Sequence, residues 1–175
     1  MGIDLRKEFQ VILDSDGLDY LFLIQSRTIR CSKWSGKEHN PRCLECGGTG
    51  WAIRFGKYKA IKQNASTLIN HAVLTQNISM GSVWSPGYIF FAPPHIPLQI
   101  KDRIFEVGWR NGIPWGMNQY FTVNHLDVMR GVDGKPAFLY IGAMTESVDA
   151  PFQNTLVNAL SKQMLAGDQL LRKGK

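Results

Sequence analysis

All three cysteines of the chain fall in one short segment, residues 31–50, which is also rich in glycine and basic residues. Cys43 and Cys46 form a Cys-x-x-Cys turn followed by two glycines, an arrangement that brings two thiolates to one ion while the backbone turns tightly beneath them. Cys31 can return to the same point as a third ligand. The segment therefore predicts a small metal-binding knuckle.

Zinc is the ion that this ligand set favours. Structural zinc sites are almost always four-coordinate, so three cysteines leave one position open, and His39, four residues before Cys43, is the expected fourth ligand. The alternative is a loop with three reduced, metal-free thiols, because a single Cys-x-x-Cys pair is weaker evidence than two pairs. The odd number of cysteines argues against a disulfide framework, and no secretory signal pattern opens the sequence, so we expect a reducing compartment.

The chain has 175 residues, a formal net charge of +6 and a pI of about 9.3, and basic residues crowd the segment around the cysteines. A polyanion such as DNA suits this clustering, because neutralising phosphates gives affinity that does not depend on sequence. No apolar stretch approaches the roughly 18 residues that a bilayer span requires, so no membrane contact is expected. The expected polyanion contacts are Arg30, Lys33, Lys37, Arg42, Arg54, Lys57 and Lys59.

The sequence does not predict an enzyme. Asn124-His125-Leu-Asp127 places a histidine and an aspartate on one face of a strand, but no nucleophile accompanies them in a known elbow. The glycines at 47–50 lack the Lys-Ser/Thr pair of a P-loop. A hydrolase using His125 and Asp127 is a weak further alternative, and we expect no catalytic residues.

The N-terminal segment predicts a short helix capped by Asp4 and ended by Gly17, because apolar residues recur between them at helical spacing. From there to about residue 145 the pattern favours strands. Runs at 20–24 and 51–61, rich in aromatic and β-branched residues, flank the cysteine segment, which makes that segment an insertion between two strands.

Later segments predict further strands at 88–91, 103–109, 118–129 and 137–141, with a proline-stiffened connection after the first. The last two bracket Asp133-Gly134, a strong hairpin signal. Several short strands separated by turns indicate a mainly β domain over residues 1–148, built as a small antiparallel barrel or sandwich.

The C-terminal segment, residues 149–175, predicts an amphipathic helical extension. Asp149-Ala-Pro151 offers an N-cap followed by a proline suited to the first turn. The apolar stripe of this helix packs either on the barrel, which the sequence favours, or on another subunit.

The order of these features resembles the zinc-knuckle head-tail connector proteins of tailed bacteriophages. The resemblance rests on Ile29-Arg30-Cys31 at a strand end, on Trp34, and on the C-x-x-C-x-G-T-G knuckle from Cys43 to Gly50. It continues through a P-x-x-x-x-D-x-I-x-E-V-x-W strand from Pro97 to Trp109, and through the hairpin residues Met129-Arg-Gly131. The family pattern has a second cysteine where this chain has Lys33, which makes His39 a substitute ligand or leaves the site empty.

The resemblance implies a head-closure or stopper-like protein of the virion neck, assembled in the host cytoplasm. Such a protein forms a homo-oligomeric ring between a portal or adaptor protein above and a tail-terminator or tail-completion protein below, and it contacts packaged DNA without sequence specificity. The alternative from the residues alone is a cytosolic zinc-knuckle module that binds nucleic acid. The two differ in assembly, since only the first requires a ring.

Overall fold

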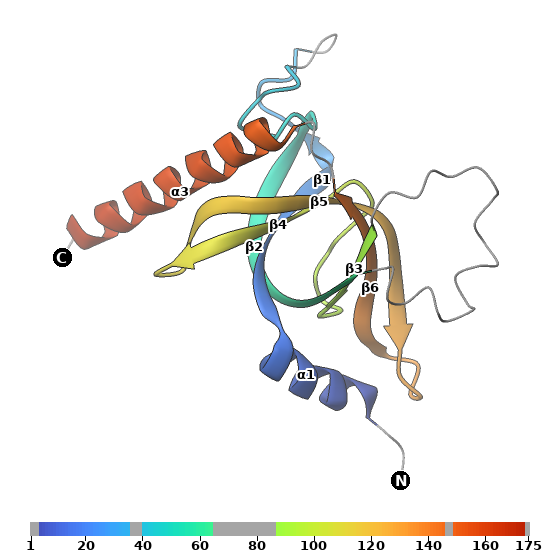
Figure 1. Ribbon diagram of the computed structural model, residues 1–175. Helices are drawn as coiled ribbons and strands as arrows, with labels where there is room; N and C mark the ends of the chain where they lie inside the picture. The colour runs from blue at the N-terminus through green and yellow to red at the C-terminus, as the bar shows by residue number, and fades with distance from the viewer. Residues whose placement is uncertain (1–3, 36–39, 65–86, 146–148, 174–175) are drawn as a thin grey trace.

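The computed structural model describes residues 4–35, 40–64, 87–145 and 149–173, which form a closed antiparallel sheet flanked by two helices (Figure 1). Within these residues the strands close into a ring in the order β1-β2-β3-β6-β5-β4. Helix α1 precedes the strands and helix α3 follows them. Their bounds are α1 Leu5–Asp16, β1 Leu18–Arg30, β2 Trp51–Asn64, β3 Gly87–Ala92, β4 Arg103–Arg110, β5 Ile113–Arg130, β6 Pro136–Thr145 and α3 Ala150–Lys173.

This architecture confirms the expected mainly β, antiparallel fold with a short N-terminal helix and a C-terminal helix. The sequence left open whether the strands form a barrel or a sandwich. They close into a ring, which is the barrel arrangement. The cysteine segment lies between β1 and β2, as expected. No helix among the described residues has the length and apolar character needed to span a bilayer.

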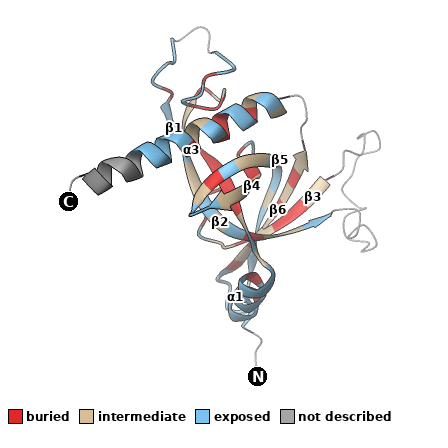
Figure 2. Cartoon of the chain, turned by 60° about the vertical axis from the view of Figure 1, so that its left-hand side comes forward, coloured by how far each residue is buried: buried red, intermediate tan, exposed pale blue. Residues whose placement is uncertain are grey.

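The interior of the ring is filled by alternate residues of the strands, many of them aromatic. Tyr20 and Phe22 of β1 point inward and are almost completely buried, as are Phe90 of β3 and Phe121 of β5 (Figure 2). The ring of Phe90 meets both Tyr20 and Phe121 edge to face, with centroids 5.3 and 5.0 Å apart. Edge-to-face pairing and burial together stabilise the interior.

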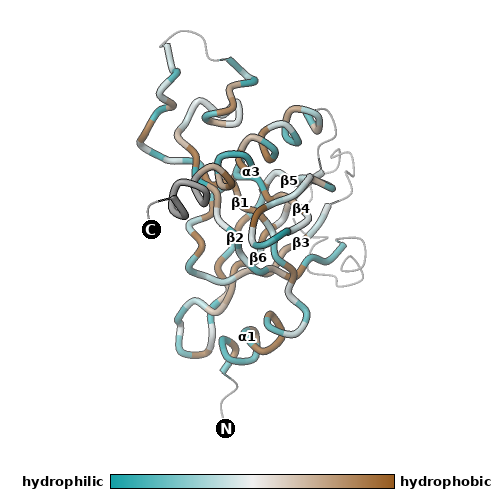
Figure 3. The backbone as a smooth tube through the Cα atoms, turned by 90° about the vertical axis from the view of Figure 1, so that its left-hand side faces the viewer, coloured by the Kyte–Doolittle hydropathy of each residue, from teal (hydrophilic) through white to brown (hydrophobic). Residues whose placement is uncertain are grey.

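Helix α3 covers part of the outer face of the sheet. Figure 3 shows α3 lying beside the strands of the sheet. Leu21 and Leu23, which alternate with the inward residues of β1, form a second apolar layer with Leu156 and Val157 of α3. The helix therefore packs on the barrel, as the sequence favoured. Its later turns extend past the sheet (Figure 1), where Met164 is 41% exposed.

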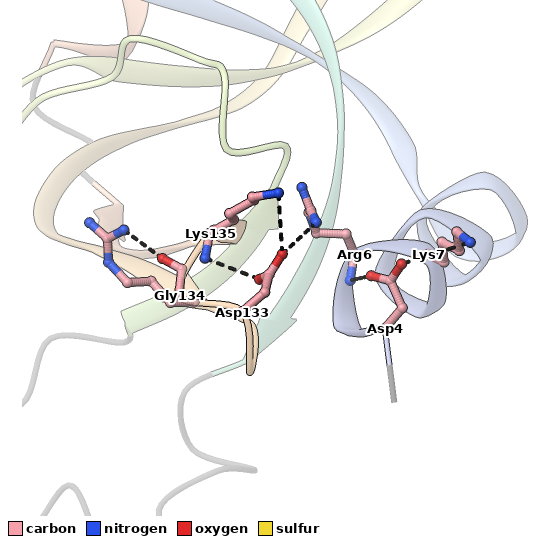
Figure 4. Close-up of polar contacts among 7 residues, drawn as sticks. Asp4, Arg6, Lys7, Asp133, Gly134 and Lys135 are labelled. Atoms are coloured by element: carbon pink, nitrogen blue, oxygen red, sulfur yellow. Dashed lines mark hydrogen bonds and ion pairs between the residues drawn. The ribbon is translucent and has the colours of Figure 1, made fainter. Parts of the chain in front are cut away.

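Helix α1 lies against the hairpin that joins β5 and β6. Asp4 caps the helix by accepting the backbone N–H of Arg6 at 3.2 Å, as expected. Phe9 stacks on Phe138 of β6 with ring centroids 4.9 Å apart. The Arg6 guanidinium also reaches the Asp133 carboxylate in the hairpin turn at 2.8 Å (Figure 4).

The Arg6–Asp133 ion pair gives a first prediction. Both side chains are more than 40% exposed, so the pair is screened by water and salt. A double-mutant cycle with Arg6→Ala and Asp133→Ala, measured by chemical denaturation, is expected to give a coupling of about 0.2–1 kcal/mol that shrinks as salt is added. A coupling above about 2 kcal/mol, or one indifferent to salt, would contradict this account.

One hairpin differs from the sequence expectation. The strand expected to begin at residue 118 begins at Ile113 and pairs with β4 across a two-residue turn. The turn residues Asn111 and Gly112 both have positive φ, at 50° and 77°, as a tight hairpin of this type requires. The Asn-Gly signal is present in the sequence and would have located the turn.

Candidate metal centre

The structure brings the three cysteines together. The sulfur atoms of Cys31, Cys43 and Cys46 all lie within 4.8 Å of one another, and each side chain is buried. The Sγ atoms of Cys31 and Cys43 are 3.9 Å apart, far beyond a disulfide bond. Sulfur ligands about 2.3 Å from a tetrahedral zinc ion lie roughly 3.8 Å from each other, so this separation fits zinc ligation.

The backbone of the knuckle is held by its own hydrogen bonds and by glycine. The N–H of Gly48 donates to the carbonyl of Cys43, and that of Thr49 to the carbonyl of Cys46, both at 3.1 Å. Gly48 has φ of 79°, and a Cβ there would lie 2.1 Å from the carbonyl oxygen of Pro41. Only glycine fits this position, so the sequence requirement follows from the turn itself.

The knuckle is anchored to the barrel and to α3. The Arg103 guanidinium of β4 donates to the carbonyl of Gly47 at 2.8 Å. The backbone of Gly47 lies so close to Leu156 of α3 that an added Cβ would be 3.1 Å from its side chain. The cysteines are thus positioned by the strands that flank the loop and by the start of the C-terminal helix.

The two knuckle thiols experience different surroundings. Burial raises the pKa of Cys46 to about 11. Burial acts in the same direction on Cys43, but backbone N–H groups of Glu45 and Cys46 donate to its sulfur and leave its pKa below the ordinary value. Since zinc binds thiolates, loading the site releases protons.

One side of the site opens to a cavity of about 260 Å³ lined by Lys33, Asn40 and Arg42 together with Cys43. His39, the expected fourth ligand, and Lys37, an expected polyanion contact, lie outside the described residues.

Lys33 pairs with Glu45 at 3.0 Å. Ser32 donates to the same carboxylate. The hydrogen bond and the charge of Glu45 raise the pKa of the Lys33 ammonium. Three thiolates around a divalent ion would leave one negative charge, which this neighbouring ammonium would offset.

The structure distributes the other expected polyanion contacts over several surfaces. Arg42 lies in the cysteine loop, and Arg54 lines a groove at one end of β2. Lys57 and Lys59 follow the outward alternation of β2, and Lys57 pairs with Asp19 at 2.9 Å. Among the described residues, Arg42, Arg54 and Lys59 take part in no ion pair, so a polyanion could contact them without breaking one.

Arg30 lies between the two tryptophans that bracket the cysteine segment. Its guanidinium is 3.7 Å from the ring centroid of Trp51 and 4.7 Å from that of Trp34. These distances are typical of cation–π contacts. The stack ties the two ends of the loop together and occupies aromatic surface that bases would otherwise use.

Sequence reasoning missed the role of Asp102. Its side chain is fully buried, and its two carboxylate oxygens accept the backbone N–H groups of Gln25 at 3.0 Å and Gln99 at 2.8 Å. Burial raises its pKa to about 6, although these hydrogen bonds and the nearby charges of Arg27 and Arg54 act to lower the pKa. Asp102 fixes the β3–β4 connection to β1 beside the open end of the barrel.

The histidine and aspartate considered for acid–base chemistry make other contacts. Asp127 accepts the backbone N–H of Val128 at 2.8 Å. His125 packs edge to face on Tyr140 with centroids 6.0 Å apart. A comparison of the chain with protein-family models and with curated proteins finds no match.

Proposed function

We propose that this chain is a structural protein of the tailed-bacteriophage neck. It forms a homo-oligomeric ring between the portal or adaptor protein and the tail-terminator or tail-completion protein, and it closes the DNA-filled head. The observation that carries the proposal is the buried three-cysteine knuckle inserted between adjacent strands of a closed antiparallel sheet. This is the arrangement that the resemblance to head-tail connectors implies.

In this function zinc has a structural role. Cys31, Cys43 and Cys46 hold the ion, which stabilises a loop too small to bury a core of its own. The loop is anchored on Arg103 and on the start of α3. A rigid loop at one end of the barrel is a suitable contact surface for a neighbouring ring of the neck.

Apolar side chains left exposed by the fold supply surfaces for ring assembly. Trp115 at the β4–β5 hairpin is 58% exposed, and Met164 and Leu165 are exposed on α3. Ser161, one turn before Met164, contacts the carbonyl of Pro114, so the hairpin and the helix are adjacent. A ring needs two different surfaces that meet head to tail, and this pair of elements is suited to form one of them.

Native mass spectrometry of the purified full chain tests the proposal. We expect one zinc ion per chain and a ring-sized oligomer, formed by the chain alone or on addition of a portal–adaptor complex. A chain that stays monomeric under both conditions would exclude the neck function. In that case the cytosolic zinc-knuckle module, which needs no ring, becomes the better candidate, although the stacking of Arg30 between both tryptophans counts against base stacking there.

A further inference from the structure

A groove lies at the open end of the barrel, where β1 bulges away from β2. The pairing of the two strands is regular up to Gln25 and resumes at Arg30, which leaves residues 26–29 looped out. The groove has a volume of about 530 Å³, and its walls include Ile24, Ile29 and Pro97. Two arginines, Arg27 and Arg54, line it as well.

Arg27 is held in place by a hydrogen bond to the connection between β3 and β4. Its Nε donates to the side-chain carbonyl of Gln99 at 2.8 Å, and the Gln99 amide donates to the backbone carbonyl of Gln25 at 2.8 Å. The buried Asp102 then accepts the backbone N–H groups of both glutamines. This network fixes the guanidinium through one nitrogen and leaves its terminal nitrogens available.

Arg54 approaches the groove from the facing strand, where it is paired in register with Ile24. Its side chain is exposed, and neither it nor Arg27 takes part in an ion pair among the residues that the structure describes. The carboxylate of Asp102, on which the charges of both arginines act, sets one negative charge against their two positive charges. The groove therefore keeps a net positive charge.

A second groove of about 300 Å³ adjoins the first and shares Gln25, Ser26 and Arg27 with it. Its other walls include Lys101 and the apolar side chains of Trp51 and Ile100. The ammonium of Lys101 adds a further cation beside the first groove, where the next phosphate along a strand would lie.

We propose that Arg27 and Arg54 form a phosphate-binding site that receives a backbone phosphate of DNA, with the adjoining groove at Lys101 receiving the next nucleotide. Guanidinium groups match phosphate oxygens in geometry, and a guanidinium fixed before binding loses less entropy when it binds. Only the choice of DNA as the phosphate-bearing polymer rests on the proposed neck function. The site deepens that proposal by naming the residues that contact DNA.

The test is a fluorescence-anisotropy titration of the purified full chain with a 15-nucleotide single strand and a 15-base-pair duplex at several salt concentrations. Arg54→Gln is expected to weaken binding of the preferred probe, and Arg27→Gln combined with Arg54→Gln to weaken it by about tenfold, with a salt slope lower by about 1–2. Arg54 takes part in no ion pair among the described residues, so the single variant removes its charge without breaking one.

The matched control is Lys7→Gln combined with Lys135→Gln, which removes the same charge from outside the groove. Its affinity is expected to change by less than about threefold. Inorganic phosphate, followed by the NMR signal of the Arg27 Nε–H, separates two sources of the ligand. If inorganic phosphate shifts this signal and competes with DNA, the site accepts any phosphate group. If DNA binds but inorganic phosphate causes no shift, the site is specific for the polymer.

Equal losses in the groove variant and in the control variant would overturn the site, as would the absence of DNA binding by the native chain. Neither result bears on the ring or on zinc, which native mass spectrometry measures separately. Conversely, a monomeric chain that loses DNA binding only in the groove variants would support the site and remove the neck function.

Discussion

Replacing Cys46 with serine is expected to lower the free energy of unfolding by more than about 3 kcal/mol in the presence of zinc. Cys46 is fully buried among the other two cysteines. A serine hydroxyl is a poor zinc ligand, so the variant loses the ion and the folding energy that the ion supplies. The measurement is chemical denaturation of the native protein and the variant, each with added zinc and each with a chelator.

The chelator separates loss of metal from loss of packing. We expect it to destabilise the native protein and to leave Cys46→Ser unchanged, because the variant has no ion to lose. Leu44→Ser is the matched control, since Leu44 lies in the same turn, is 45% exposed and has no ligand atom. If the chelator leaves the native protein unchanged, the thiols are free and the metal-free alternative holds.

Asp102 gives the second large effect. Replacing it with alanine leaves two partly buried N–H groups, those of Gln25 and Gln99, without their acceptor. Each buried donor left unsatisfied costs about 1–3 kcal/mol, so we expect Asp102→Ala to lower the free energy of unfolding by about 2–5 kcal/mol. Denaturation curves measure this directly, and a loss below about 1 kcal/mol would show that water reaches both groups.

Asp102 also makes stability depend on pH in a defined direction. Its pKa is raised to about 6 in the folded chain, compared with about 3.9 in an unfolded chain. Between these values the folded state binds more protons, so its stability decreases as the pH rises from about 4 to about 6, and then levels off. Asp102→Asn cannot titrate, so the difference in stability between the native protein and this variant should change over this window and remain constant above it.

Local signals predicted most of the secondary structure. The caps and spacing at Asp4 and at Pro151 located both helices, and Asp133-Gly134 located the β5–β6 hairpin. These features succeed because each is decided by residues within a few positions of one another. The cysteine cluster was predicted for a related reason, since a Cys-x-x-Cys turn largely determines its own geometry.

Features that depend on distant residues were not accessible in the same way. In the sequence, Asp102 and Glu106 are noted only as members of the motif from Pro97 to Trp109. The structure gives each a physical role. Asp102 anchors two backbone segments, and Glu106 pairs with Lys62. The partners lie on other strands, so no local pattern in the sequence connects them.

The clustering of basic residues illustrates the same limit. Arg54 and Lys57 are three positions apart in the sequence, but strand alternation directs Arg54 to the groove and Lys57 to the outer face with Asp19. Arg27 joins Arg54 because the β1 bulge turns it toward the groove. Density of charge along the chain predicted a polyanion contact, whereas the position of that contact required the register of the sheet.

The closure of the ring determines how the chain folds. Strands β1 and β4 complete the ring through three residue pairs only, among them Leu21 with Phe105, whose positions in the chain are more than eighty residues apart. Bringing such distant segments together lowers the entropy of the chain before any stabilising contact forms between them. The hairpins β4–β5 and β5–β6 join segments that are close in the chain and are expected to form first, whereas the β1–β4 seam is expected to form late. Refolding should therefore be slow for a chain of this size, and it should pass its rate-limiting step when this seam closes.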